Sequence, residues 1–176
     1  MLRAYQKLLD KHFLLVQCVQ TGSMMAVGDV VAQTLIEKKQ NKEFEPMRTV
    51  KFGLLGVCFV GPTLTVWYRI LAKYLGKSGS SSGALKKVAI DQIVFLPTFL
   101  AVFIANVNLM NGKNMRDLKQ EMVKTYPDVV INSWKIWPAV QLINFYWVPR
   151  HYQVLLVQTV ALFWNPYLSW KTQKVH

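Results

Sequence analysis

The sequence predicts an all-α fold, a polytopic membrane helix bundle that forms a single membrane domain over residues 1–176. Only 17% of the residues are charged and 52% are hydrophobic, whereas soluble domains carry roughly 25% charged residues. The charges also cluster and leave long apolar stretches between them. A soluble helix would expose polar residues at every turn or two, so these stretches are expected to face lipid.

Four apolar stretches are each long enough for the roughly 20 residues that a transmembrane helix needs: residues 14–36, 52–71, 88–110 and 129–148. Pro62, after Gly61, lies inside the second stretch and Pro97 inside the third. Each proline removes a backbone hydrogen bond and is expected to bend its helix. A further apolar run, residues 152–170, either crosses the membrane or dips into the bundle at Asn165-Pro166. The sequence thus supports four spans and permits five.

The connecting segments are polar. Residues 1–13 lack the apolar block and cleavage site of a secretory signal, so targeting information is expected to be internal and retained. Residues 76–83 have the Gly/Ser composition of a flexible linker. Asn114 is placed to cap a short helix in which Met115, Leu118 and Met122 share a face. Such a helix lies either along a membrane surface or in a solvated loop.

The net charge of +12 is compatible with nucleic acid, anionic lipid or anionic solutes. No nucleic-acid-binding motif accompanies it, so the expected partner is the lipid bilayer and no direct nucleic-acid contact is predicted. Lys and Arg are shared almost equally between the two sides of a four-span topology, which leaves the orientation open.

Catalytic and metal-binding patterns are absent from the sequence. Cys18 and Cys58 lie in apolar stretches without the spacing of a zinc site or disulfide framework. The three histidines lie outside the apolar centres, and no nucleophile elbow, zincin motif or phosphate-binding loop is present. We therefore predict no enzyme activity, no metal and no cofactor.

The first apolar stretch carries a polar stripe. At about 100° per residue, Gly22, Ala26, Asp29 and Gln33 lie within about 60° of one another. Small residues allow a neighbouring helix to come close, and a carboxylate at membrane depth must face a partner, the bundle interior or water. Asp29 and Gln33 are predicted either to hold helices together or to border a path for solutes.

Asp91 and Gln92 stand near the start of the third stretch, and Asp91 shares a helical face with Thr98. One interpretation places Asp91 on a solute path. The other makes it a helix-initiating carboxylate near the positive end of the helix dipole, within reach of Lys86 or Lys87.

The fourth stretch concentrates amide and aromatic side chains on one face: Trp134, Trp137, Gln141, Asn144, Phe145 and Val148. Pro138 leaves the carbonyl of Trp134 without its helical hydrogen bond. Such a face can line a path with amides and a backbone carbonyl, or it can hold two helices together through buried amides.

These residues carry a family resemblance. The motifs are Gly28-Asp29-x-x-x-Gln33, Gly61-Pro62-x-x-x-x-Trp67-Tyr68, Asp91-Gln92 with Pro97 beyond, Trp134-x-x-Trp137-Pro138-x-x-Gln141-x-x-Asn144-Phe145-x-x-x-Pro149, and Trp164-Asn-x-Tyr-Leu-Ser-Trp170. Their arrangement over the whole chain resembles the Mpv-seventeen and peroxisomal-membrane-protein family. Trp137-Pro-Ala-Val-Gln-Leu-x-Asn-Phe-Tyr and Tyr167-Leu-Ser-Trp-Lys171 are closer to its mitochondrial branch. Arg150 departs from the apolar residue expected beside Pro149.

The resemblance implies an integral protein of the mitochondrial inner membrane, with the peroxisomal membrane as the alternative, and usually four spans. It further implies kinship with weakly selective pores and links to mitochondrial DNA maintenance and reactive oxygen species. We therefore expect a channel for small solutes or ions, in which a set of polar residues lines or shapes the path: Asp29, Gln33, Asp91, Gln92, Gln141 and Asn144.

Two alternatives stay open. In the first, the chain is a non-conducting structural or assembly protein, alone or in a homo-oligomer or inner-membrane complex, and its buried amides hold helices together. In the second, the chain is an intramembrane enzyme, which requires Asp29 and Asp91 to share a proton at a separation of a few ångströms.

Overall fold

The computed structural model describes residues 2–37, 43–76 and 81–173, and every regular element in those ranges is a helix. The predicted all-α membrane bundle is confirmed. The chain divides into two compact units, residues 1–76 together with 148–176, and residues 77–147.

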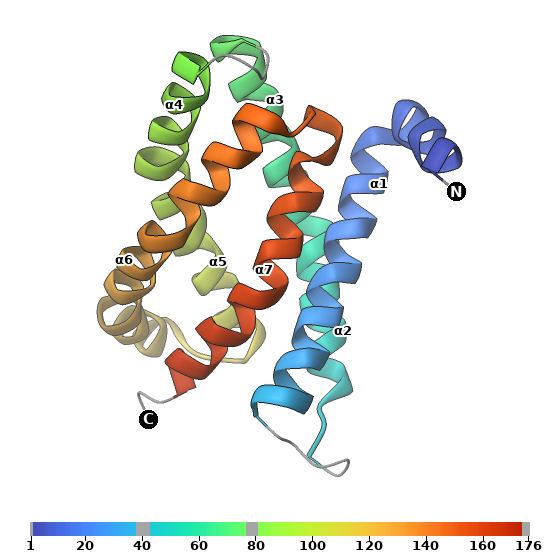
Figure 1. Cartoon of the computed structure of the whole chain (residues 1–176). Coiled ribbons are helices and arrows are strands. Elements are labelled where there is room, and N and C mark those ends of the chain that lie inside the picture. Colours follow the sequence, from blue (N-terminus) through green and yellow to red (C-terminus); the bar gives the residue numbers. More distant parts are fainter. Residues whose placement is uncertain (1, 38–42, 77–80, 174–176) are drawn as a thin grey trace. The chain divides into compact units, whose positions relative to one another are not determined.

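The first unit contains α1 (Leu2–Val31), α2 (Pro46–Leu55), α3 (Gly61–Leu75) and α7 (Arg150–Gln173), with five-residue π-helices η1 (Ala32–Ile36) and η2 (Gly56–Val60). The long α1 packs against α2, η2, α3 and α7 (Figure 1). His12 interrupts it, because its backbone leaves the helical region at φ −135° and ψ 49°. The segment beyond His12 continues into the first predicted span.

The second unit contains α4 (Ser81–Ile90), the π-helix η3 (Asp91–Phe95), α5 (Leu96–Met110) and α6 (Met115–Trp147). The C-terminal helix of this unit, α6, packs against both α4 and α5. A turn at Asn111-Gly112, with Gly112 at φ +77°, separates α5 from α6. The helix α5 thus ends at the same residue as the predicted apolar stretch 88–110.

Two broken helices, one in each unit, have the same construction. Ten α-helical residues are followed by five π-helical and fifteen α-helical residues, in Pro46–Leu75 and again in Ser81–Met110. Pro62 and Pro97 each occupy the second position of the fifteen-residue segment. Proline cannot donate to the preceding turn, and in both helices a wider π-turn ends two residues before it. Next to each proline at which a bend was predicted, the helix thus contains a π-turn.

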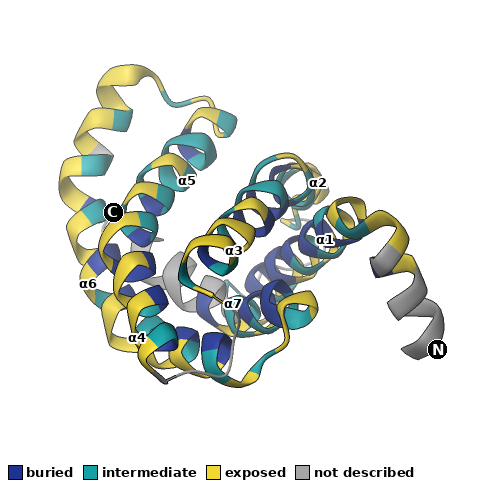
Figure 2. Ribbon diagram, turned by 90° about the horizontal axis from the view of Figure 1, so that it is seen from above, coloured by how far each residue is buried: buried dark blue, intermediate teal, exposed yellow. Residues whose placement is uncertain are grey.

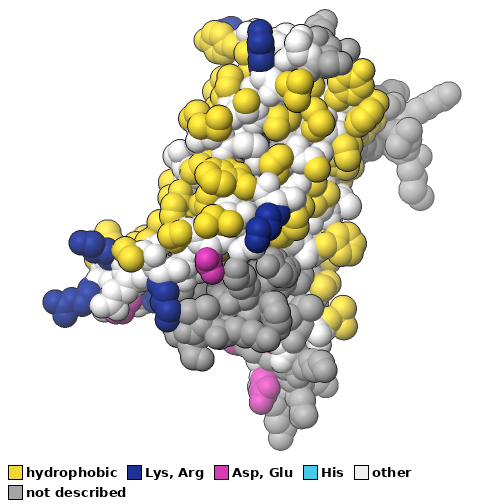
Figure 3. Space-filling view, turned by 60° about the vertical axis from the view of Figure 1, so that its left-hand side comes forward, with side chains coloured by type: hydrophobic (Ala, Val, Ile, Leu, Met, Phe, Trp, Pro, Cys, Tyr) yellow, Lys and Arg dark blue, Asp and Glu magenta, His cyan; other side chains and the backbone are white. Residues whose placement is uncertain are grey.

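Three helical stretches among the described residues are long and apolar enough to cross a membrane: Lys11–Leu35, Pro46–Leu75 and Ser82–Met110. They carry large exposed hydrophobic residues, such as Leu15 (66% exposed) and Ile93 (72% exposed). Figure 2 shows exposed and buried residues on opposite sides of the same helices, and hydrophobic side chains cover much of the face in Figure 3. Exposed Leu and Ile at this density are expected for surfaces solvated by lipid. The choice between four and five spans stays a prediction.

The helices extend beyond the predicted apolar stretches. The second begins at Pro46 rather than at residue 52, and the third at Ser81 rather than at residue 88. Hydropathy marks the lipid-facing part of a helix, whereas backbone hydrogen bonding continues into the polar segment. The predicted linker 76–83 is shorter for the same reason, since Ser81–Gly83 are helical and residues 77–80 lie outside the described part.

The predicted short helix after Asn114 is the first part of α6. Asn114 does cap it, because its Oδ1 accepts hydrogen bonds from the backbone N–H groups of Arg116 (2.9 Å) and Asp117 (3.0 Å). The helix then runs on through Pro127 and Pro138 to Trp147. The prediction of a separate short helix was wrong, because Pro127 is accommodated inside α6 instead of ending it.

Candidate functional site

Asp29 is the centre of a buried ionic network in the first unit, formed by Asp29, Gln33, Glu37, Arg48 and Thr49. Its Oδ1 lies 2.8 Å from Nε of Arg48, and its Oδ2 accepts hydrogen bonds from Thr49 Oγ1 (2.7 Å) and Gln33 Nε2 (2.8 Å). The two terminal nitrogens of the Arg48 guanidinium donate hydrogen bonds, of 2.9 and 2.8 Å, to the carboxylate of Glu37. Arg48 therefore compensates two carboxylates whose side chains are 2% and 4% exposed.

Gln33 joins this network to the backbone before α2. The N–H of Glu45 donates to Gln33 Oε1 (2.8 Å), while Gln33 Nε2 also lies 3.2 Å from the Glu45 carbonyl oxygen. Gln33 is completely buried. Every polar atom of its side chain is thus engaged, and the arrangement fixes the start of α2 against the end of the first span.

Glycine contacts explain how α1 and the α2–η2–α3 helix approach so closely. A Cβ on Gly56 would lie 2.6 Å from Cα of Gly22, and one on Gly61 would lie 2.8 Å from Cα of Cys18. Such backbone-to-backbone contact leaves no room for a side chain. The predicted stripe of Gly22, Ala26, Asp29 and Gln33 therefore faces α2 and η2.

A second network lies in the second unit and consists of Asp91, Gln92, Trp134, Gln141 and Asn144. Asp91 Oδ2 accepts hydrogen bonds from Gln92 Nε2 (2.9 Å) and Gln141 Nε2 (3.0 Å). Asn144 Nδ2 donates to Gln141 Oε1 (3.0 Å), and the Trp134 indole N–H donates to the Gln92 carbonyl oxygen (3.1 Å). The Gln141 amide and the Trp134 indole of α6 thus contact the first two residues of η3, and Asn144 holds Gln141 in place.

Asp91 does not begin a helix. It follows ten residues of α4 and is the first residue of η3, inside the stretch Ser82–Met110. The helix-initiating interpretation of this carboxylate was therefore wrong. Asp91 is 1% exposed, Asn144 is fully buried, and Gln92 and Gln141 are buried as well. The structure brings these four sequence-predicted residues together, and Asp29 and Gln33 form their own group in the first unit.

The sequence did not predict a set of buried polar atoms that lack a hydrogen-bond partner. In the described part of the first unit the set includes Gln17 Oε1, Thr21 Oγ1 and Thr65 Oγ1. In the described part of the second unit it includes Gln92 Oε1 and Ser133 Oγ. Gln17 does use its amide nitrogen, which donates to the carbonyl oxygen of His151 (2.9 Å). One signal was available, because Gln17 and Thr21 are one turn apart and lie on the same helical face.

Hydroxyl groups on the exposed surface behave differently. Ser23, Thr34, Thr98 and Thr159 each donate to the backbone carbonyl four residues earlier, at 2.7–2.9 Å. This bond is the usual way for a helical hydroxyl to be satisfied in an apolar surrounding. Thr21, Thr65 and Ser133 are buried and lack such a bond. Unsatisfied polar atoms inside a protein call for water or another ligand.

The remaining motif residues have mostly structural positions. Tyr68, Phe145 and Trp164 are buried, Gly28 faces Leu162 of α7, and Pro149 is exposed between α6 and α7. Trp67, Trp137, Pro62 and Pro138 are half-buried. Trp134 is 47% exposed although its indole N–H is bonded. The side chain of Trp170 lies outside the described part, and Arg150 is exposed.

Long apolar helices with carboxylates and amides buried at membrane depth define a polytopic helical membrane protein. Residues 108–169 match the model of the Mpv17 / PMP22 family. The chain is 44% identical to the mitochondrial inner membrane protein Mpv17 of Xenopus laevis over 98% of this chain and 97% of that protein. It is 41% identical to the protein of that name from Homo sapiens, over 98% of each chain.

A fungal relative, protein sym-1 of Neurospora crassa, is 36% identical over 97% of this chain and 98% of its own length. No solved structure matches the chain. The chain belongs to the Mpv17 / PMP22 family, and the resemblance drawn from its motifs is confirmed. It is a protein of the mitochondrial inner membrane.

Proposed function

We propose that this protein is a weakly selective channel for small solutes or ions in the mitochondrial inner membrane. The observation that carries the proposal is the set of buried polar atoms without protein partners, on Gln17, Thr21, Thr65, Gln92 and Ser133. A buried polar atom left unbonded costs about 1–3 kcal/mol. Water or a polar solute inside each unit would remove that cost, and a hydrated interior is what a path through a membrane protein requires.

The Asp91 network is the part of the site that we assign to the path. Asp91, Gln92, Gln141 and Asn144 combine a carboxylate with neutral amides at a π-helical break. Helices interrupted by Gly or Pro in corresponding positions of two halves are frequent at transport sites, and π-turns are frequent at functional sites. We assign the Asp29 network to helix packing in the first unit, because Arg48 pairs with both Asp29 and Glu37.

The alternative is a non-conducting structural or assembly protein. The Asp29 network favours it for the first unit, because this network is a complete helix-to-helix contact. A homo-oligomer or an inner-membrane complex is compatible with both functions. On the channel proposal, support of mitochondrial DNA maintenance and of reactive-oxygen handling follows from solute exchange across the membrane.

Release of small solutes from proteoliposomes tests the proposal. Vesicles loaded with radiolabelled solutes of graded size are expected to lose the small ones and to retain the large ones when they contain the purified protein. Vesicles that contain heat-denatured protein serve as the leak control. Equal retention of every solute by vesicles with folded protein would favour the structural alternative.

A further inference from the structure

The first turns of α6 lie next to a membrane-spanning helix. The stretch Ser82–Met110 ends at Met110, and Lys113 and the cap residue Asn114 follow the turn at Gly112. Lys113 and Asn114 are therefore near the level at which that span ends, and the following turns of α6 run back alongside α5. The hydroxyl of Tyr126, three turns into α6, donates to the carbonyl oxygen of Pro97 (3.0 Å) and ties this part of α6 to α5.

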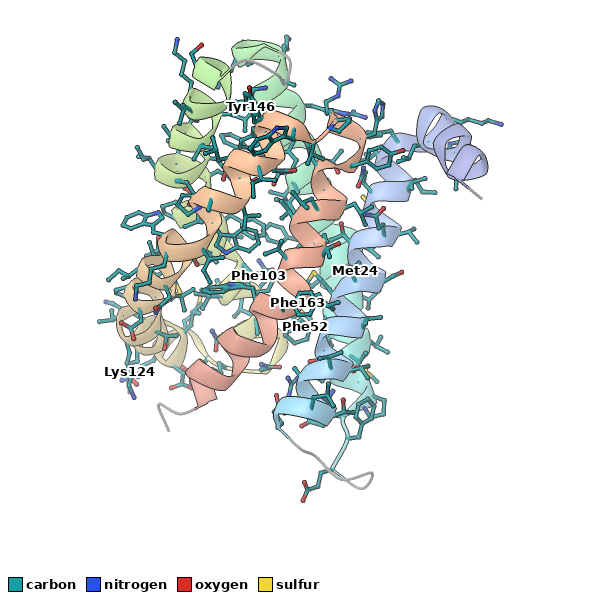
Figure 4. All side chains as sticks on the ribbon, viewed as in Figure 1. Met24, Phe52, Phe103, Lys124, Tyr146 and Phe163 are labelled. Atoms are coloured by element: carbon teal, nitrogen blue, oxygen red, sulfur yellow. The ribbon has the colours of Figure 1, made fainter. Side chains whose placement is uncertain are left out.

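One flank of this segment mixes exposed apolar and basic side chains. Met115 and Val123 are each 73% exposed, and Arg116 and Lys119 are exposed as well. At about 100° per residue all four fall within a sector of about 100°. Lys124, labelled in Figure 4, is also exposed, but it lies about 80° beyond that sector.

This mixture of apolar and basic side chains suits neither water nor the hydrocarbon interior of the membrane. In water, Met115 and Val123 would expose apolar area without compensation, and in hydrocarbon the charges of Arg116 and Lys119 would be expensive. At the interface both requirements are met, because apolar side chains enter the acyl boundary while basic groups reach phosphates. Of the two interpretations of this helix, surface-bound or solvated, the composition of this flank favours the membrane surface.

We propose that the flank formed by Arg116, Lys119, Met115 and Val123, together with Lys113, binds the headgroups of anionic phospholipids. Arg116 and Lys119 contact the lipid phosphates, and Met115 and Val123 insert beside the acyl chains. The positive charge of the flank selects anionic over zwitterionic headgroups. This binding is independent of whether the protein conducts.

The test uses the full chain in a neutral detergent, with binding of phosphatidylglycerol and of phosphatidylcholine measured by native mass spectrometry. The protein is expected to retain phosphatidylglycerol preferentially. Lys119→Gln should weaken its binding roughly fivefold, the factor expected for loss of one basic residue near a charged surface. Lys124→Gln removes the same charge from the same helix outside the flank and should leave the binding within about twofold of the parent value.

A second variant, Met115→Gln/Val123→Gln, leaves the charge unchanged and should also weaken phosphatidylglycerol binding. Both sites are exposed, so an unchanged unfolding temperature without lipid is expected to show that the variants fold. Equal losses for Lys119→Gln and Lys124→Gln would overturn the proposal, as would equal retention of the two lipids. Competition by inorganic phosphate as effective as competition by phosphatidylglycerol would also overturn it, because a free anion would then be the ligand.

Discussion

Arg48 at the start of α2 lies with Nε 2.8 Å from Oδ1 of Asp29, and its terminal nitrogens donate to Glu37. One guanidinium thus connects the second span to both the interior and the end of the first. Its planar donor geometry matches two carboxylates at once, which a Lys ammonium cannot reproduce. The contact favours the structural interpretation of Asp29 in the first unit.

Arg48→Gln should lower the free energy of unfolding by about 3 kcal/mol, because it leaves two buried carboxylates without a cation. Thermal and denaturant unfolding in detergent measures the loss, and Arg48→Lys should restore only part of it. In a double-mutant cycle, Asp29→Asn combined with Arg48→Gln should cost less than the sum of the single changes. Strict additivity of the two changes would show that the pair does not interact.

Gly22→Ala should destabilise the first unit by about 1–3 kcal/mol. The added Cβ would meet the side chain of Val57 and lie 2.8 Å from the carbonyl oxygen of Gly53, so backbone would have to move. Gly28→Ala is the matched control in the same helix, because its Cβ would lie 3.5 Å from Leu162, an ordinary contact. Both changes bring the same gain in helix propensity. Equal unfolding temperatures for the two variants would contradict the close packing of α1.

Thr65→Val should lower solute release while it leaves stability unchanged or raises it by about 1 kcal/mol. Its hydroxyl is buried and has no protein partner, so removing it relieves an unbonded group and makes the interior less polar. Thr98→Val is the control, since Thr98 donates to the Val94 carbonyl on the exposed surface. If Thr65→Val destabilised the protein and left solute release intact, the hydroxyl would belong to a structural contact.

Gln141→Leu should weaken the second unit, because Asp91 Oδ2 loses the donor that lies 3.0 Å away. The cost expected for a buried acceptor deprived of a partner is about 1–3 kcal/mol. Leu142, its exposed neighbour, provides the comparison, and Leu142→Ala should leave the unfolding temperature nearly unchanged. If Leu142→Ala lowered the unfolding temperature more than Gln141→Leu, the exposed side of α6 would contribute more to stability than the Asp91 network.

The membrane class and the inward faces could be predicted because hydropathy and helical periodicity are local properties. Gln141, Asn144 and Asp91 fell on predicted faces and do meet. The partner of Asp29 could not be predicted, because Arg48 stands in a polar segment that reads as a loop, and helix α2 begins earlier than its apolar part. The hydroxyls of Thr21 and Thr65, which lack a partner, could not be predicted either. A threonine in an apolar helix usually donates its hydroxyl to the backbone carbonyl four residues earlier.

The continuity of α6 through Pro127 was missed for a related reason. A proline is a probable helix boundary in a sequence, yet packing against α4 and α5 holds α6 together on both sides of it. The π-turns before Pro62 and Pro97 were anticipated only as bends. Their form depends on tertiary packing, and hydropathy does not encode it.

Single-channel recording in planar bilayers tests the channel most directly, with the wild type beside Asp91→Asn and Asp29→Asn. The wild type should conduct. Asp91→Asn should shift the reversal potential in a salt gradient, because a carboxylate on the path sets charge preference. Asp29→Asn should lower the unfolding temperature and leave the reversal potential close to that of the wild type. Silent bilayers containing folded wild-type protein would contradict the account.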